Sequence, residues 1–141
     1  RVLFRSMLKE TPVIPLRNEL DEVKGIQLIG IDDGENPDQV DKVLSMMQID
    51  PAKPAILMYH RPQGFEAAAK TGVDLMLTGH THNGQIWPFN WVVKSHFQYL
   101  KGLHRIDGMY LSISTGSGTW GPPMRLGSRN QITFIHLKKD D

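Results

Sequence analysis

Apolar residues along the chain form short runs that alternate with amphipathic stretches, and this order predicts an α/β fold. The strand candidates are residues 26–31, 55–59 and 73–77, and the helix candidates between them are residues 37–47 and 64–70. The run at 55–59 has no polar alternation, as expected when both faces of a strand are covered. Strand, helix, strand, helix, strand is the order that favours a largely parallel sheet.

The N-terminal residues give less regular signals. Residues 1–9 have rough helical spacing, which predicts the end of a helix that Pro12 stops. Residues 13–16 are a short strand candidate, and Pro15 assigns it to the edge of a sheet. Residues 18–25 read as a polar connection or hairpin loop.

The pattern changes to antiparallel β after Gly84. Residues 102–106 and 109–114 form a predicted hairpin around Asp107-Gly108, a favoured turn pair. The remaining assignments are an irregular aromatic-rich stretch at 88–101, a Gly/Pro-rich loop at 115–128 and a final strand at 131–138. We therefore expect a mostly parallel sheet with helices, joined to an antiparallel sheet.

The composition of the chain excludes several classes of function and site but does not alter the predicted fold. The 141 residues suit one domain or half-domain (1–141), and the net charge of +1 carries no nucleic-acid-binding signature. The chain has no cysteine, which excludes disulfides and thiolate ligands, and no apolar run long enough to span a membrane. Because it opens on Arg1 within a structured-looking segment, we expect it to be a piece of a longer protein.

Three histidines follow two neighbouring strand candidates. His60 comes directly after residues 55–59, and His80 and His82 come after residues 73–77. Ligands of open α/β sheets bind outside the carboxyl ends of the strands, and imidazoles without thiols suit zinc, iron or manganese. The pattern therefore indicates a metal site. An alternative interpretation is that the histidines cap strand ends and bind the backbone.

The residues around these histidines resemble a known family. Gly79-His80-Thr81-His82, followed by Asn83-Gly84-Gln85, resembles the GHTH-GGQ signature of the calcineurin-like metallophosphoesterases, and His60-Arg61-Pro62 resembles their His-x-Pro. Residues 31–33, 72–75 and 118–125 are similar to the bacterial branch. The resemblance implies the C-terminal half of a four-layer α/β/β/α sandwich.

The resemblance implies a metal-dependent hydrolase of phosphate mono- or diesters with a binuclear metal centre. In the intact protein, two divalent ions (manganese, zinc or iron) would be held, one by His60 and His80 and the other by His82. Thr81 is expected to orient one ligand through its hydroxyl. Since imidazoles ligate metal only when neutral, activity is expected to fall in acid.

This sequence departs from the family pattern. The family motifs Asp-x-His, Gly-Asp-x-x-Asp and Gly-Asn-His-Glu are absent, Asp32-Asp33 does not replace them, and Asn83 stands in place of a glycine. No catalytic residue is therefore assigned. We expect this chain alone to bind metal weakly or not at all and to show little catalysis.

Other residues are secondary candidates. Asn83 and Arg125 are predicted to bind substrate. For Arg125 the reason is that a guanidinium matches the geometry of a phosphate. Core or interface packing, or a substrate cleft, is expected for Trp87, Trp91 and Trp120, and surface or interface positions for His96, His104 and His136. The serines at 112, 114 and 117 have no visible base partner, which argues against a serine hydrolase.

The expected partners are a phosphoester substrate and either a missing N-terminal half or a second copy, since half a sandwich exposes sheet edges. Full-length bacterial relatives are often membrane-anchored or exported, and this sequence leaves the location open. The alternative function is a non-catalytic binding or assembly module with structural histidines. A third interpretation is metal storage or sensing by the histidines alone.

Overall fold

The computed structural model describes residues 8, 10–36 and 38–138. Six strands form one mixed sheet in the order β1-β2-β3-β4-β6-β5. The strands are β1 (Glu19–Val23), β2 (Ile26–Gly30), β3 (Ala55–Met58), β4 (Leu75–Thr78), β5 (Gly102–Ile106) and β6 (Met109–Ile113). The helices are α2 (Gln39–Leu44), α3 (Phe65–Lys70), the 3-10 turn η1 (His82–Gly84) and α4 (Asn90–His96). The α/β class is confirmed.

The middle of the sheet is parallel and the two outer pairs are antiparallel. Strands β2, β3, β4 and β6 run in the same direction, while β1 pairs antiparallel with β2 and β5 with β6. The predicted parallel and antiparallel parts therefore belong to a single sheet in the described part of the chain. Because β3, β4 and β6 are parallel neighbours, their carboxyl ends meet at one edge.

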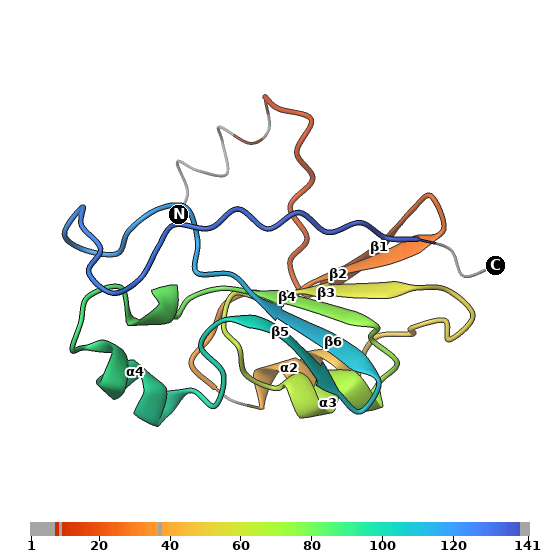
Figure 1. Ribbon diagram of the computed structural model, residues 1–141. Coiled ribbons are helices and arrows are strands. Elements are labelled where there is room, and N and C mark those ends of the chain that lie inside the picture. The colour runs from red at the N-terminus through yellow and green to blue at the C-terminus, as the bar shows by residue number, and fades with distance from the viewer. Residues whose placement is uncertain (1–7, 9, 37, 139–141) are drawn as a thin grey trace.

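One face of the sheet carries the core. Ile29, Leu57, Met76 and Leu111 are register partners across the four parallel strands, and none of them is exposed to solvent. The helices α2 and α3 cover this face (Figure 1), with Val40, Leu44 and Ala68 fully or almost fully buried. This row packs in one core with α2 and α3 and so supports the strands whose ends carry the histidines.

The opposite face is covered less completely. Met58 of β3 is 39% exposed, so the prediction that both faces of this strand are covered is wrong for the described residues. An extended segment, residues 131–138, runs on the side of the sheet away from α2 and α3 (Figure 1). Ile132 and Phe134 in this segment are 91% and 90% exposed.

Two predicted strands are not formed. Residues 131–138 are extended but pair with no described strand, and residues 13–16 are irregular, as Pro15 lacks an amide to donate. The segment predicted as a polar connection instead contains β1, which reaches β2 through a turn at Lys24-Gly25. The predicted helix at 1–9 lies outside the described residues, apart from Leu8.

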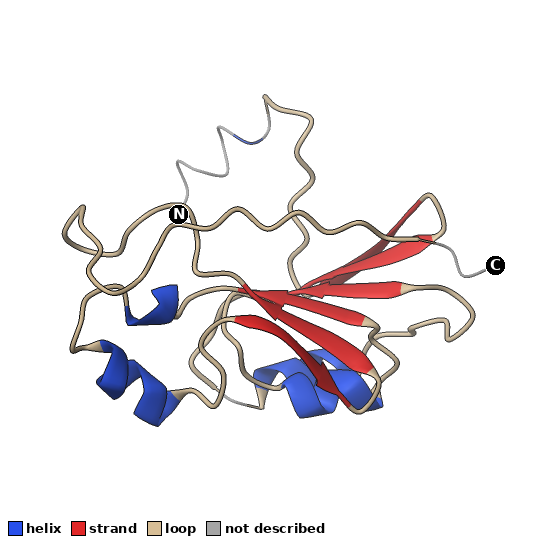
Figure 2. Cartoon of the chain, in the orientation of Figure 1, coloured by secondary structure: helices blue, strands red, loops and turns tan. Residues whose placement is uncertain are grey.

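The second half also contains a helix where an irregular stretch was expected. Residues 88–101 contain α4, which has no buried residue. The predicted hairpin around Asp107-Gly108 is confirmed: both turn residues have positive φ, 46° and 96°. The long loop 115–128 and α4 lie at the same end of the sheet (Figure 2). None of the described helices is long and apolar enough to cross a membrane.

Candidate functional site

The carboxyl ends of β3 and β4 hold the first two histidines side by side. His60 and His80 each stand two residues beyond the end of their strand. The parallel pairing continues past both strands, because the Tyr59 amide donates to the Leu77 carbonyl (3.1 Å) and the Gly79 amide donates to the His60 carbonyl (3.0 Å). The ladder of the sheet therefore sets the separation of the two backbones.

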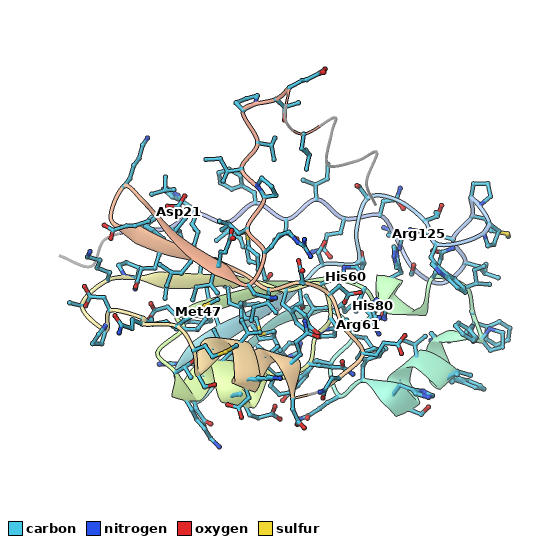
Figure 3. All side chains as sticks on the ribbon, turned by 180° about the vertical axis from the view of Figure 1, so that it is seen from behind. Asp21, Met47, His60, Arg61, His80 and Arg125 are labelled. Carbon is cyan, nitrogen blue, oxygen red and sulfur yellow. The ribbon has the colours of Figure 1, made fainter. Side chains whose placement is uncertain are left out.

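The two imidazoles meet at their ring nitrogens. Nδ1 of His80 lies 3.1 Å from Nε2 of His60, and the rings are nearly perpendicular at 83° (Figure 3). If both nitrogens bound one ion at about 2.1 Å, this separation would correspond to an angle of about 95° at the ion. The pair therefore fits two adjacent ligands of one metal ion. Without a metal, the same distance fits a hydrogen bond between the rings.

The loop that carries the histidines is held in an uncommon conformation. Positive φ angles occur at His80 (66°), His82 (48°), Asn83 (51°) and Gln85 (46°). A non-glycine residue in this region costs of order 1–3 kcal/mol, and such strain clusters where side chains must be aimed at a ligand. The surrounding contacts must offset this cost.

His82 lies in a different environment from the His60–His80 pair. Nη2 of Arg125 lies 3.2 Å from Nδ1 of His82, and Nη1 donates to the His82 carbonyl (3.3 Å). Because a guanidinium can only donate, Nδ1 of a neutral His82 accepts and its ring proton lies on Nε2. The structure thus brings the His60 and His80 rings into contact, and the described contacts of the His82 ring nitrogen are with Arg125.

Arg125 also binds the loop that follows β6. Its Nη2 donates to the carbonyls of Thr115 (2.8 Å), Gly116 (3.2 Å) and Gly118. The guanidinium therefore fastens this loop to His82 in the described structure. Its predicted contact with a substrate phosphate stays a prediction.

The pKa of both loop histidines is lowered, which favours their neutral form. Burial lowers the pKa of His80, and the positive charge of Arg61 lowers it further. Burial also lowers the pKa of His82, with Arg125 adding repulsion. Arg61 is itself fixed by an ion pair with Asp33, whose Oδ1 lies 2.8 Å from Nε. Neutral imidazoles are the form that binds a metal ion.

Gln85 is a site residue that sequence reasoning did not single out. Its buried side chain accepts from the Trp120 amide (2.6 Å) and donates to the carbonyls of Trp120 (2.7 Å) and Pro122 (3.3 Å). It is therefore a second clamp between the histidine loop and residues 115–128. A polar residue directly after a tight turn in the motif was the available signal.

Thr81 has a role other than the expected one. Its hydroxyl donates to the Leu100 carbonyl (2.6 Å) and accepts from the Asn83 amide (3.3 Å). It therefore ties the histidine loop to the segment after α4. Gly84 brings α4 itself close, because a Cβ there would lie 2.2 Å from the Cα of Asn90.

Two cavities adjoin this loop. The first, of about 330 Å³, is lined by His60, His80, Thr81, His82, Gly84, Gln85, Phe89, Val93, Phe97 and Trp120. The second, of about 580 Å³, is lined by Asn83, Lys101, Thr115, Gly127, Ser128, Arg129, Asn130 and Gln131. Asn83 thus faces the second cavity, and its predicted contact with substrate stays a prediction.

The secondary candidates are dispersed. His96 and His136 are exposed, and His104 stacks on Tyr99 with ring centroids 4.3 Å apart. Trp87, Trp91 and Trp120 are all more than half exposed, so none packs in the core, and only Trp120 lines the cavity with the histidines.

The histidine pair fits part of a metal centre rather than a whole one. Within the described ranges, no group of three or more His, Cys, Asp or Glu side chains could hold a metal ion. Asp32 and Asp33 form ion pairs with Arg17 and Arg61 instead. His60 and His80 can supply two ligands, and a complete ion shell would need further donors.

Comparison with known proteins gives a consistent set of relatives. Two proteins of Helicobacter pylori, both named metallophosphoesterases, are 37% identical over 141 residues (strain 26695) and 34% over 140 residues (strain J99). A Bos taurus protein named a transmembrane protein with metallophosphoesterase domain is 31% identical over 152 residues. Each match covers 94% of this chain, which spans 37% of the two bacterial proteins and 34% of the bovine one. No family model matches the chain. No solved structure matches it either.

Proposed function

The chain belongs to the calcineurin-like metallophosphoesterase family, and from this premise we propose that the protein containing it hydrolyses phosphate mono- or diesters with divalent metal ions. In this proposal His60 and His80 hold one ion, and His82 contributes to a second. The metal can be manganese, zinc or iron, because imidazole ligands suit all three.

One observation carries the proposal: the 3.1 Å separation of the His60 and His80 ring nitrogens at the ends of adjacent parallel strands. Crevices at these strand ends are where open α/β sheets bind ligands. The left-handed backbone of the following loop adds support, because strain of this kind persists where a functional geometry is needed.

The residues of this chain would hold and orient the reacting groups. When bound, divalent ions polarise a phosphate and lower the pKa of water. His60 and His80 present ring nitrogens 3.1 Å apart, and the lowered pKa of His80 favours the neutral imidazole that can bind a metal ion. Arg125 and Gln85 hold the 115–128 loop beside the site. The remaining ligands and the acid that assists the leaving group would come from outside the described residues.

A second candidate is a binding or assembly module that keeps its histidines as structural residues. The contact between Arg125 and Nδ1 of His82 favours it, since that nitrogen is already engaged without a metal. The enzyme should show turnover that depends on a divalent ion and on the histidines, whereas the module should not.

The test uses the full-length protein with p-nitrophenyl phosphate and bis(p-nitrophenyl) phosphate, titrated with manganese, zinc and ferrous ions. We expect metal-dependent turnover, and a loss of at least about 100-fold in kcat/KM for the double variant His80→Ala, His82→Ala. The matched control is His136→Ala, which removes an exposed histidine outside the histidine loop. Unchanged turnover in the double variant would favour the module.

We also propose that residues 131–138 pack against a further part of the protein or a second copy of it. The support is the exposure of Ile132 and Phe134, whose apolar side chains have no cover among the described residues. Phe134→Asp should lower the thermal stability of the full-length protein or its apparent mass in solution. No change in either would contradict the proposal.

A further inference from the structure

We propose that the 330 Å³ cavity beside His60 and His80 receives an apolar organic group of the phosphoester, an alkyl chain or an aryl ring. This inference rests on the proposed phosphoesterase function and names the substrate class that the same site would favour. Two observations support it: apolar side chains line much of the cavity, and the polar side chains in its wall already have hydrogen-bond partners.

The apolar wall comes from one face of α4 and its flanks. Phe89, Val93 and Phe97 follow one another at intervals of four residues, which places them on the same side of the helix. The Phe97 ring packs against the His80 ring with centroids 5.5 Å apart. The apolar surface therefore begins where the imidazole pair ends, so that a phosphate beside the histidines would direct its organic group along α4.

The position of this wall is fixed by the histidine loop. A Cβ on Gly84 would lie 2.2 Å from the Cα of Asn90, so the close approach of α4 depends on a glycine at this point. The Thr81 hydroxyl binds the Leu100 carbonyl on the other side of the helix. The apolar face is thus held against the site at both ends of α4.

The polar groups that line the cavity have partners already. The Gln85 amide is bound to the backbone of Trp120 and Pro122, and the Thr81 hydroxyl is bound to Leu100. Apart from the three histidines, no titratable side chain of the described chain lines it. A sugar or a nucleotide base would lose its water there without new hydrogen bonds, which is unfavourable, whereas an alkyl or aryl group would not.

The neighbouring cavity shows the opposite chemistry. It is lined by Lys101 and Arg129, together with Ser128 and Asn130, and neither basic residue forms an ion pair in the described structure. The histidine loop therefore has a polar cavity on one side and a mainly apolar cavity on another. The volume of the apolar cavity is at the lower end of the range for small-molecule sites, which suits one ring or a short chain.

The test measures binding apart from turnover. Calorimetry on the metal-loaded full-length protein would compare hexylphosphonate with methylphosphonate, which share the phosphonate and differ only in the alkyl group. We expect hexylphosphonate to bind at least about 10-fold more tightly, because several methylene groups leave water. Equal affinities would overturn the inference.

Two adjacent valines provide matched variants. Val93 lines the cavity, while Val92 lies on the exposed side of α4 at 49% exposure. Threonine has nearly the shape of valine, so neither substitution should unfold the helix. Val93→Thr should reduce the hexyl-to-methyl affinity ratio by about 3-fold or more, and Val92→Thr should leave it unchanged. An equal effect of both variants would contradict the placement of the alkyl group.

Turnover separates this inference from the proposed function. Hexyl phosphate and glycerol 3-phosphate have similar alkoxide leaving groups and differ in polarity, so the inference expects a higher kcat/KM for hexyl phosphate. Hydrolysis of both at equal kcat/KM would refute the apolar site and leave the phosphoesterase proposal standing. Preferential binding of hexylphosphonate without hydrolysis of any phosphoester would support the apolar site and refute the enzyme proposal.

Discussion

Nδ1 of His80 lies 3.1 Å from Nε2 of His60, across two parallel strands that are adjacent in the sheet and 20 residues apart in sequence. The relationship depends on backbone pairing, because the Gly79 amide donates to the carbonyl of His60 itself. The two ring nitrogens are therefore brought together by the sheet rather than by a flexible loop.

Metal binding at this pair should stabilise the fold. A ligand that binds only the folded state adds about 2.7 kcal/mol at 100 times its Kd. Manganese or zinc in that excess should raise the Tm of the full-length protein, and His60→Ala should reduce the increase. His96→Ala, which alters an exposed histidine on α4, is the control. An equal increase in the His60→Ala variant would show that the ion binds elsewhere.

Arg125→Lys should loosen the loop at 115–128. A lysine cannot reproduce the fork that reaches His82, Thr115 and Gly116 together, and hydrogen bonds to charged groups contribute about 1.5–3 kcal/mol each. We expect a loss of about 1–3 kcal/mol in urea unfolding and faster hydrogen exchange in the loop. Arg129→Lys, four residues along, is the control, and an equal loss there would contradict the assignment.

The stability of the metal-free protein should depend on pH through His80 and His82. Burial, with Arg61 for one and Arg125 for the other, lowers their pKa in the folded state below the ordinary value of 6.5. The unfolded chain then binds more protons between the folded pKa and 6.5, so the free energy of unfolding rises with pH across that window.

This free energy should reach its full value above pH 6.5 and fall as the pH decreases through the folded pKa values. Denaturant unfolding at several values from about pH 5 to 8 would measure it. The double variant His80→Gln, His82→Gln should flatten this dependence, whereas His136→Gln should not. A slope that persists in the double variant would assign the effect to other groups.

Gly84→Ala should displace α4 from the histidine loop. The new Cβ would meet Asn90 in addition to the strain of a φ near +75°, and strain alone costs about 1–2 kcal/mol. Gly25→Ala is a matched control, because it has a φ of +80° and nothing within 4 Å of the added Cβ. The first variant should therefore lose more stability than the second, as measured by thermal unfolding. Equal losses would mean that α4 moves without cost.

Leu57→Ala should destabilise the fold through the central row of the sheet. Leu57 is fully buried between Ile29 and Met76, and such a substitution costs about 2–5 kcal/mol. Leu103→Ala, at an exposed position of β5, should change the free energy of unfolding by no more than about 0.5 kcal/mol. Chemical denaturation of both variants gives the comparison.

The parallel strands were predictable because burial imposes a simple pattern on them. Ile29, Leu57 and Met76 lie in short, mainly apolar runs, and the histidines follow the ends of two such runs. The neighbourhood of His60 and His80 then follows from the carboxyl-end rule for parallel sheets. The Asp107-Gly108 turn was predictable for an equally local reason, since both residues tolerate positive φ.

The elements that the sequence did not predict depend on tertiary contacts or on pairing with one neighbouring strand. Strand β1 is an edge strand rich in acidic residues, and only its pairing with β2 identifies it. Helix α4 buries no residue, and its apolar side chains Val93 and, at its flanks, Phe89 and Phe97 line a cavity instead of the core. The roles of Gln85 and Arg125 depend on partners more than 30 residues away or on loop carbonyls, which no local pattern encodes.

The strand directions place the histidine loop at one end of the sheet and two hairpin turns at the other. The turns Lys24-Gly25 and Asp107-Gly108 precede β2 and β6, so they lie at the amino ends of the strands, away from the histidines. A fluorophore or an affinity handle inserted at either turn would report on the protein from that remote end. Ligand exchange at the histidines could then be followed in a labelled protein whose chemistry is undisturbed.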